Sequence, residues 1–418
     1  MEKLIIRGGK KLHGDVKISG MKNSALPVIF ATILANDVCT IKNLPDVSDI
    51  ALALETLGTI GAEVRFIDTT TAIIDTRGVE MKSPPLEYVS KMRGSTYLIG
   101  AMLGRFGKAQ VGAPGGCNFG DRPINQHLKG FALLGARTSF ESNAMIQAEA
   151  PDGLHGNLVY LDIASVGATI NIMLAATFAE GTTIIENAAR EPHIVDTACF
   201  LNACGANIMG AGTNMIKIKG VKKLHGCTYE LAPDMIEAGT YMVAAAATGG
   251  RVTVKNIVPK HMEAVIAKLN EIGIPLEIKD DSITVSGTDS FRATEIRTNP
   301  YPGFPTDMQP QFAALLACAK GVSKVSESIW SGRFKYAAEL NKMGANIDVI
   351  GNEAIINGVP FLEGAEVKAS DLRAGACLVI AGLAADGVTS VSNVEYIDRG
   401  YEDLIDKLKR LGADIKRV

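Results

Sequence analysis

Three cations in this sequence stand where a helix is about to begin. Lys22, Arg93 and Arg373 each precede a run of Ala- and Leu-rich residues that predicts a helix. A cation at a helix N-terminus opposes the helix dipole and costs about 0.3 kcal/mol or more. A bound anion would reverse that sign, because free backbone N–H groups and the cation would converge on it. We therefore expect these three side chains to bind an anionic ligand.

A second set of cations precedes the more polar helices. It occupies five of six corresponding loops, at Arg122, Arg190, Lys260, Arg333 and Arg399. A single surface arginine is usually solvated or weakly paired, but five at one level of a repeated pattern indicate a basic rim around a cleft. Guanidinium groups bind phosphate and carboxylate through paired hydrogen bonds, so the predicted ligand carries several negative charges.

The loop from Gly112 to Pro123 contains four glycines in its first nine residues. This composition suits a lid that closes over a ligand. Cys117 lies between Gly116 and Asn118, with no apolar helix or strand to bury it. We interpret Cys117 as a reactive thiol that acts as an acid, as a nucleophile or as both.

Several other chemistries are not indicated. The sequence has no GxxxxGK[ST] or GxGxxG motif for a nucleotide cofactor, and no GxSxG motif. It has no HExxH or paired CxxC motif, and its six histidines are scattered singly. We expect neither a cofactor nor a metal. Ser24, Ser95 and Asp234 also stand at predicted helix starts, where helix capping is their ordinary role.

A repeat of about 70 residues must position these groups. Glycines that end predicted helices recur at intervals of 74, 70, 68, 71 and 68 residues; they are Gly61, Gly135, Gly205, Gly273, Gly344 and Gly412. Bulky residues stand four positions before each glycine, from Leu57 to Leu408, and one position before it stand other apolar residues. These two positions share a helix face, and a terminal glycine supplies the left-handed conformation that closes a helix.

Each repeat also contains a helix that is apolar nearly all round, followed by a β-branched strand. Examples are Ile170–Ala176 before Thr182–Asn187 and Tyr241–Ala246 before Val252–Asn256. Such helices are buried. The expected fold is α/β, a two-lobed inverse α/β barrel of six repeats with buried helices inside sheets and outer helices. We expect one lobe at residues 22–231, with the Cys117 loop, and the other at residues 1–21 plus 232–418, with the active site in the cleft between them.

Composition sets outer limits on function. The 418 residues carry 42 Lys plus Arg and 45 Asp plus Glu, a net charge of −3, and 47% are hydrophobic. This is typical of a globular protein of several domains, and the lack of basic excess argues against nucleic-acid binding. The seven cysteines show no disulfide spacing, and no apolar run is long enough to span a membrane. We expect a cytoplasmic protein, and the sequence predicts no oligomeric state.

The sequence resembles the UDP-N-acetylglucosamine 1-carboxyvinyltransferases of the enolpyruvyl transferase family over its whole length. The resemblance rests on the sixfold repeat and on four sequence blocks, which are Lys22-Asn23, Pro114-Gly115-Gly116-Cys117 with Arg122-Pro123, Phe304-Pro305-Thr306-Asp307-Met308-Gln309 and Asp398-Arg399-Gly400-Tyr401. It implies transfer of the enolpyruvyl group of phosphoenolpyruvate to the 3′-hydroxyl of UDP-N-acetylglucosamine, the first committed step of peptidoglycan synthesis.

The resemblance also implies residue roles. Cys117 matches the family's proton donor, which can form an adduct with the substrate, and Asp307 matches the candidate base. Lys22, Arg122 and Arg399 match phosphate ligands, whereas Arg333 and Arg373 fall where the substrate carboxylate is bound. The positions that match nucleotide-sugar contacts are Asn23, Arg93, Arg122, Pro123, Ile124, Asn125, Gln126, Ser165, Val166, Gly167, Asp307 and Ile329.

Two departures from the family pattern bear on the nucleotide sugar. Ile163 stands where a lysine can occur, and Asn125-Gln126 stands where Asp-Leu is expected. Two other functions stay open. One is the sister activity, 3-phosphoshikimate 1-carboxyvinyltransferase, and the other is a non-catalytic six-unit ring like a processivity clamp, which the net charge disfavours.

Overall fold

The computed structural model describes residues 2–113, 115, 123–140 and 145–418. The chain divides into two compact units. The first consists of residues 2–19 and 233–418, and the second of the described residues between 20 and 232. Each unit has its own cluster of buried apolar side chains, so each has its own hydrophobic core.

The sixfold repeat is confirmed by the backbone of its glycines. Their φ angles are 108° at Gly61, 96° at Gly135, 101° at Gly205, 94° at Gly273, 85° at Gly344 and 97° at Gly412. The amide after each glycine donates to the carbonyl four residues before that glycine, at N···O distances of 2.9 to 3.2 Å. This bond satisfies a carbonyl that the end of a helix would otherwise leave open.

These glycines end the outer helices. In the second unit the outer helices are α2 (Ser48–Thr59), α5 (Asn125–Leu133) and α7 (Pro192–Ala203), and in the first unit they are α9 (Glu263–Ile272), α11 (Lys335–Lys342) and α13 (Leu404–Arg410). The side chains four positions and one position before each glycine are buried, from Leu57 and Ile60 to Leu408 and Leu411. The predicted apolar face therefore packs each outer helix onto its unit.

Three further helices form the centre of each unit. They are α1 (Lys22–Ala35), α4 (Tyr97–Phe106) and α6 (Val166–Ala176) in the second unit, and α8 (Met235–Ala247), α10 (Gln309–Leu316) and α12 (Leu372–Ala384) in the first. The three helices of a unit pack against one another. Every residue of α1 from Ser24 onward is buried, as is α12 from Leu372 to Leu383. Helices apolar on all sides are thus enclosed, as predicted.

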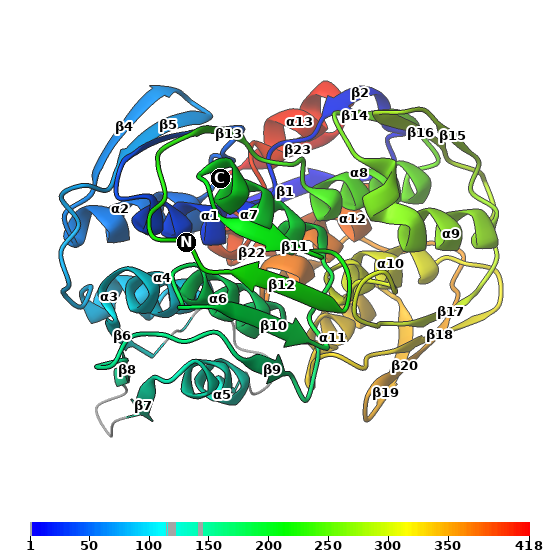
Figure 1. Cartoon of the computed structure of the whole chain (residues 1–418). Helices are drawn as coiled ribbons and strands as arrows, with labels where there is room; N and C mark the ends of the chain where they lie inside the picture. The colour runs from blue at the N-terminus through cyan, green and yellow to red at the C-terminus, as the bar shows by residue number, and fades with distance from the viewer. Residues whose placement is uncertain (1, 114, 116–122, 141–144) are drawn as a thin grey trace. The chain divides into compact units, whose positions relative to one another are not determined.

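The described residues form three sheets in each unit. In the second unit, one sheet has the strand order β13 (Thr228–Glu230), β3 (Val38–Lys42), β5 (Thr71–Asp75), β4 (Glu63–Asp68). Another has the order β11 (Asn207–Met209), β12 (Met215–Lys219), β10 (Thr182–Glu186), β9 (Leu158–Tyr160). The three-stranded sheet has the order β6 (Lys108–Gly112), β8 (Met145–Glu149), β7 (Arg137–Phe140). Figure 1 shows β10, β12 and β11 as one green sheet, and β12 contacts the buried helix α6.

The first unit takes two strands from the N-terminal residues. One of its sheets has the strand order β21 (Glu366–Lys368), β22 (Val388–Ser392), β1 (Lys3–Arg7), β23 (Asp414–Arg417). Another has the order β15 (Leu276–Ile278), β16 (Ser282–Ser286), β14 (Arg251–Lys255), β2 (His13–Lys17). The remaining one has the order β17 (Glu295–Arg297), β18 (Val322–Ser326), β20 (Glu353–Asn357), β19 (Asn346–Ile350). Each four-stranded sheet combines one parallel pair with antiparallel pairs.

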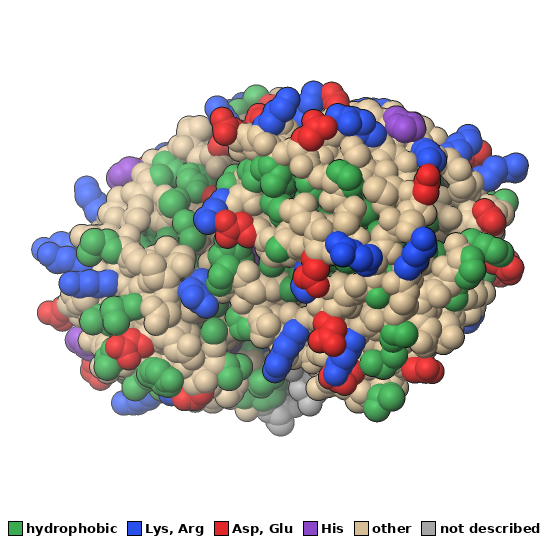
Figure 2. Space-filling model, turned by 90° about the vertical axis from the view of Figure 1, so that its right-hand side faces the viewer, with side chains coloured by type: hydrophobic (Ala, Val, Ile, Leu, Met, Phe, Trp, Pro, Cys, Tyr) green, Lys and Arg blue, Asp and Glu red, His purple; other side chains and the backbone are tan. Residues whose placement is uncertain are grey.

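Charges of both signs are interspersed on the face drawn in Figure 2. Opposite charges also pair at the surface of the first unit. Lys255 Nζ lies 2.5 Å from Asp15 Oδ2, and Arg251 Nη2 lies 2.9 Å from Glu277 Oε1. Among the described residues, no helix combines the length and the apolarity that crossing a membrane requires.

Candidate functional site

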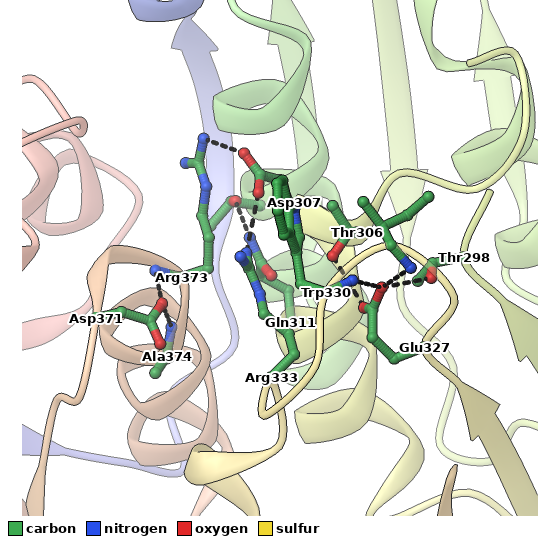
Figure 3. A network of polar contacts seen from close by, with 12 residues as sticks. Thr298, Thr306, Asp307, Gln311, Glu327, Trp330, Arg333, Asp371, Arg373 and Ala374 are labelled. Carbon is green, nitrogen blue, oxygen red and sulfur yellow. Dashed lines mark hydrogen bonds and ion pairs between the residues drawn. The ribbon is translucent and has the colours of Figure 1, made fainter. Parts of the chain in front are cut away.

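Asp307 lies between two buried guanidinium groups of the first unit. It belongs to a 3₁₀ turn, η3 (Thr306–Met308), that leads into α10. Nη2 of Arg333 donates to Oδ1 of Asp307 at 2.9 Å, and Nη2 of Arg373 donates to Oδ2 at 3.0 Å (Figure 3). The Arg333 side chain is 1% exposed and that of Asp307 is 28% exposed. Two cations around one carboxylate leave a net positive charge that favours an anionic ligand.

Arg373 is fixed by the start of α12. Asp371 caps this helix by accepting hydrogen bonds from the amides of Arg373 and Ala374, at 2.9 and 3.1 Å. The Arg373 guanidinium also lies 5.5 Å from the ring centre of Tyr401. Burial lowers the pKa of Arg373, but the charge of Asp307 outweighs burial and raises the pKa above its ordinary value. Arg373 is therefore a permanent cation with little freedom to move.

A network of neutral groups forms hydrogen bonds with the Tyr401 hydroxyl. The Tyr401 hydroxyl and Thr240 Oγ1 are 2.9 Å apart, and the Gln311 side-chain amide donates to both oxygens at 3.3 and 3.2 Å. Thr240 lies on α8 and Gln311 on α10. The three buried helices of the unit thereby act together to hold one aromatic ring against Arg373.

Glu327 is a buried carboxylate directly after β18, and it organises both loops of this site. Its Oε1 accepts hydrogen bonds from the Thr298 hydroxyl and from the amides of Ile329 and Trp330, at 2.8, 2.8 and 3.2 Å. Its Oε2 accepts one from the Thr306 hydroxyl at 2.9 Å (Figure 3). Thr306 precedes Asp307, and Ile329 begins the turn that carries Arg333, so Glu327 fixes both partners of the ion pair.

Glu327 stands where four of the other five repeats have an asparagine, and the remaining repeat has Ala113 after β6 (Lys108–Gly112). Asn43, Asn187, Asn256 and Asn393 follow the corresponding strands β3, β10, β14 and β22, and all four have φ between 54° and 59°. Each asparagine donates its side-chain amide to a backbone carbonyl at 2.8 to 3.0 Å. Sequence reasoning missed Glu327, although a comparison of the residues that follow these strands would have shown a carboxylate where most repeats have an asparagine.

Lys22 of the second unit also has a carboxylate partner. It is the first residue of α1, and its Nζ donates to Oδ2 of Asp49 at 2.9 Å. The two side chains are 12% and 6% exposed. The sequence predicts a bound anion as the compensating charge at Lys22, whereas in the structure the Asp49 carboxylate, in the first turn of α2, supplies one. Asn23 follows Lys22 in the first turn of α1 and is half-buried.

A second cluster of the second unit forms where α6 begins. Ser165 caps α6 by accepting a hydrogen bond from the amide of Ala168 at 3.3 Å. His127 on α5 packs against Gly167, since a Cβ added at that glycine would lie 2.9 Å from the imidazole. Burial first, and then the charge of Arg93, lower the pKa of His127 to about 3, so its imidazole is neutral. Sequence reasoning did not select His127.

The remaining predicted contacts of the second unit differ in exposure. Asn125 begins α5 and is exposed, whereas the buried Gln126 exchanges two hydrogen bonds with Asp162, at 2.9 and 3.0 Å. Pro123 is exposed and Ile124 is half-buried, as is Val166. Ile163, the departure from the family pattern, is 60% exposed.

The predicted basic rim is not uniform. Arg190 and Lys260 are exposed, and Lys260 pairs with Glu263 at 2.5 Å. Arg333 is buried, because the Asp307 carboxylate binds it inside the unit, and Arg399 is half-buried. Cys117 and Arg122 lie outside the described residues. Of the predicted site residues, the described structure brings Asp307, Arg333 and Arg373 into direct contact.

The two clusters have distinct chemical capacities. In the first unit an ionised carboxylate, the form that accepts a proton, is held between two guanidinium groups. In the second unit the capped start of α6 lies against the neutral imidazole of His127, on which the charge of Arg93 acts, an arrangement suited to a phosphate-bearing ligand.

Comparisons with known proteins place this geometry in a family. The sequence profile of the family described as EPSP synthase (3-phosphoshikimate 1-carboxyvinyltransferase) matches residues 6–408. The chain is 53% identical over 419 residues to the UDP-N-acetylglucosamine 1-carboxyvinyltransferase of Clostridium botulinum, and 54% identical over 419 residues to UDP-N-acetylglucosamine 1-carboxyvinyltransferase 3 of Caldanaerobacter subterraneus. Both matches cover 100% of each chain. Among solved structures, the enolpyruvyl transferase NikO from Streptomyces tendae is similar, with a TM-score of 0.91 and 27% identity over 100% of this chain and 99% of that one.

Proposed function

The chain belongs to the EPSP synthase family of enolpyruvyl transferases, and from this premise we propose that it transfers the enolpyruvyl group of phosphoenolpyruvate to the 3′-hydroxyl of UDP-N-acetylglucosamine, with release of phosphate. The observation that carries the proposal is the full-length identity of more than half to proteins named for this activity. In this role the protein would act in the cytoplasm, at the entry to peptidoglycan synthesis.

The reaction adds and then eliminates. The sugar hydroxyl oxygen bonds to C2 of phosphoenolpyruvate, while C3 gains a proton and the hydroxyl loses one. The C2–O bond to phosphate then breaks and C3 loses a proton, which restores the double bond in the transferred group. The protein must therefore supply an acid, a base and fixed positive charge for the phosphate and carboxylate.

We assign the base to Asp307 and the acid to Cys117. The support for Asp307 is its ionised, partly exposed carboxylate, which two arginines hold in one orientation. The support for Cys117 is chemical, since a thiol with a pKa near 8.5 keeps its proton at neutral pH and can donate it.

We assign anion binding to five cations. They are Arg333, Arg373 and Arg399, together with Lys22 and Arg122. Arg333 and Arg373 are buried and held by hydrogen bonds, so little side-chain entropy is lost when they meet an anion. Arg93 and the capped start of α6 are assigned to the diphosphate of the nucleotide sugar.

The test is phosphate release by the purified chain with phosphoenolpyruvate and UDP-N-acetylglucosamine, together with mass spectrometry of the sugar product. We expect release only with both substrates, and a product heavier by the enolpyruvyl group. Shikimate 3-phosphate in place of the UDP-sugar should give none. Phosphate release with phosphoenolpyruvate and shikimate 3-phosphate, but not with phosphoenolpyruvate and the UDP-sugar, would reassign the chain to the sister activity. No release with either acceptor would refute catalysis.

A further inference from the structure

Three thiols meet at one junction of the second unit. Cys39 is the second residue of β3, Cys204 follows the last residue of α7, and Cys227 directly precedes β13. The sulfur atoms of Cys204 and Cys227 are 3.3 Å apart. Cys39 is buried at the same junction.

The backbone fixes this arrangement. β13 runs parallel to β3 with Thr228 opposite Thr40, and the amide of Thr40 donates to the Cys227 carbonyl at 2.9 Å. The amide of His225 donates to the Cys204 carbonyl, also at 2.9 Å. Cys204 and Cys227 are therefore held close by regular secondary structure on either side.

The fold itself does not require sulfur here, because the same junction recurs in other repeats. The bond from His225 to Cys204 has counterparts from His155 to Leu134, from Arg292 to Ile272 and from Glu363 to Met343, at 2.8 to 2.9 Å. The side chains that correspond to Cys204, Cys227 and Cys39 are Leu134, Asn157 and Thr183; Ile272, Thr294 and Ser323; and Met343, Ala365 and Thr389. Apolar, amide and hydroxyl side chains therefore serve the structural role, and paired thiols add a chemical property.

The three thiols differ in access and in charge. Cys39 and Cys204 are fully buried, whereas Cys227 is half-buried and is the thiol that a small reagent in solution reaches first. Hydrogen bonds from Cys204 and then from Cys39 lower the pKa of Cys227, and donating to Cys227 raises the pKa of Cys204. Cys227 therefore has thiolate character, and Cys204 keeps its proton.

We propose that Cys227 and Cys204 form an oxidation site, at which hydrogen peroxide converts the two thiols into a disulfide. The Cys227 thiolate bonds to one peroxide oxygen, the O–O bond breaks, and the products are a Cys227 sulfenic acid and hydroxide. The Cys204 sulfur then bonds to the Cys227 sulfur, and the sulfenic oxygen leaves with the thiol proton as water. Two thiols and one peroxide thus give one disulfide and two waters.

The sulfur separation permits this step. The two sulfurs lie 3.3 Å apart, and because a disulfide bond is about 2.05 Å long they must approach by about 1.2 Å to form one. The sulfurs are not proposed as a metal site, because no group of three His, Cys, Asp or Glu in the described ranges is placed to hold a metal ion. The proposal is independent of the proposed function.

The test treats the reduced full-length protein with hydrogen peroxide and maps its cysteines by non-reducing proteolysis and mass spectrometry. We expect a peptide pair joined through Cys204 and Cys227, lighter by two hydrogens than the separate peptides and split again by a reductant. Cys199, an exposed thiol on α7 whose pKa burial raises, serves as the internal control and should react more slowly.

A variant completes the test. Ala365 occupies the position of Cys227 in another repeat, so we expect the Cys227→Ala variant to fold. In this variant Cys204 should stay reduced under the same treatment. Three results would overturn the proposal: oxidation of Cys199 before any linkage of Cys204 to Cys227, linkage of Cys227 to Cys39 instead, or unchanged oxidation of Cys204 in the variant.

Discussion

Asp307 and Glu327 are two carboxylates of the first unit in opposite surroundings. Asp307 is partly exposed and bound by two charged guanidinium groups, whereas Glu327 is buried and accepts hydrogen bonds from hydroxyls and amides. Different environments allow two carboxylates of one site to take different roles. Only Asp307 is available to a substrate, so Glu327 is a positioning residue.

Replacing Glu327 by alanine should disable the site. The change removes the acceptor that holds Thr306 and the turn before Arg333, so we expect kcat to fall at least tenfold, a loss of about 1.4 kcal/mol of transition-state stabilisation. Glu327→Gln keeps one acceptor oxygen and should recover most of the activity. Steady-state kinetics on both variants measures the effect.

Asn256→Gly is the matched control for Glu327. Asn256 stands at the corresponding position of another repeat, with φ of 59°, and donates to the Ile18 carbonyl at 2.8 Å. Glycine keeps this backbone conformation but loses the hydrogen bond, so stability should fall slightly and kcat should stay unchanged. Equal losses of kcat in both variants would show that Glu327 has only a structural role.

Cys117→Asp should keep turnover with a lower pH optimum if Cys117 acts as an acid. An aspartate with a pKa near 3.9 carries a proton only at lower pH than a thiol does. Cys117→Ser should lose proton donation at the pH optimum of the wild type and at that of Cys117→Asp, because a hydroxyl is a far weaker acid than a thiol or a carboxyl group. Rate profiles against pH measure this, and inactivity of both variants would favour the covalent adduct as the essential role.

At the scale of an element, the glycine that ends each outer helix has a conformational rather than a steric role. Gly273 has φ of 94°, and a Cβ added there would meet nothing within 4 Å. Gly58, inside α2, also has open space around an added Cβ but has no positive φ. The two positions therefore separate backbone strain from crowding.

Gly273→Ala should destabilise the protein by about 1 kcal/mol, because the left-handed conformation is costly for alanine. Gly58→Ala should stabilise it by up to about 1 kcal/mol, since alanine is the better helix former. Chemical denaturation of both variants measures the difference. A loss of stability at Gly58 as large as at Gly273 would contradict the assigned role.

The start of α8 contains a group that links stability to pH. Oε1 of Glu237 accepts from Nζ of Lys407 at 2.6 Å, and Oε2 accepts from the amide of Ser19 at 2.9 Å. Burial raises the pKa of Glu237 from 4.5 to about 7, although Lys407 opposes the shift. The folded protein thus keeps a proton that the unfolded chain releases, and stability falls as pH rises from about 4.5 to about 7.

Glu237→Gln should remove this dependence. Relative to the variant, the wild type should lose about 1–3 kcal/mol of unfolding free energy between pH 5 and pH 8, with no further change above that range. Urea denaturation at several pH values measures the difference between the two proteins. A difference that stays constant, or that grows in favour of the wild type, would contradict the raised pKa.

At the scale of the whole molecule, the two units differ in how the chain builds them. The described residues of the second unit all lie between positions 20 and 232, whereas the first unit takes its strands β1 and β2 from the N-terminal residues. β1 pairs with both β22 and β23, and β2 pairs with β14. Ser19 also supplies the amide that bonds to Glu237. The first unit is thus incomplete without residues far away in sequence.

Fragments test this organisation. We propose that residues 20–232 fold alone into a cooperatively unfolding domain, because their core contains no residue of the other unit. Residues 233–418 alone should stay unfolded, and fusion of residues 1–19 should restore folding. Circular dichroism and thermal melting of the three fragments measure this outcome. A stable fold of residues 233–418 by themselves would show that β1 and β2 are dispensable.

The repeat, its six glycines, the all-apolar helices and the cations at helix starts can be recognised from the amino-acid sequence alone. These features are local, since a helix face or a left-handed residue depends on neighbours within a few positions. The regular spacing then allowed corresponding positions to be compared across six copies, which is how the functional loops were found.

The side chains that become partners could not be predicted from the sequence and follow from the fold. Lys22 contacts Asp49, which is 27 residues away in sequence. Arg373 contacts Asp307 across 66 residues, and Cys204 contacts Cys227 across 23 residues. Such partners come from different elements, whose packing brings them within a few ångströms of one another. Pairing depends on distance in space and on burial, and spacing along the chain encodes neither once the chain has passed through a turn.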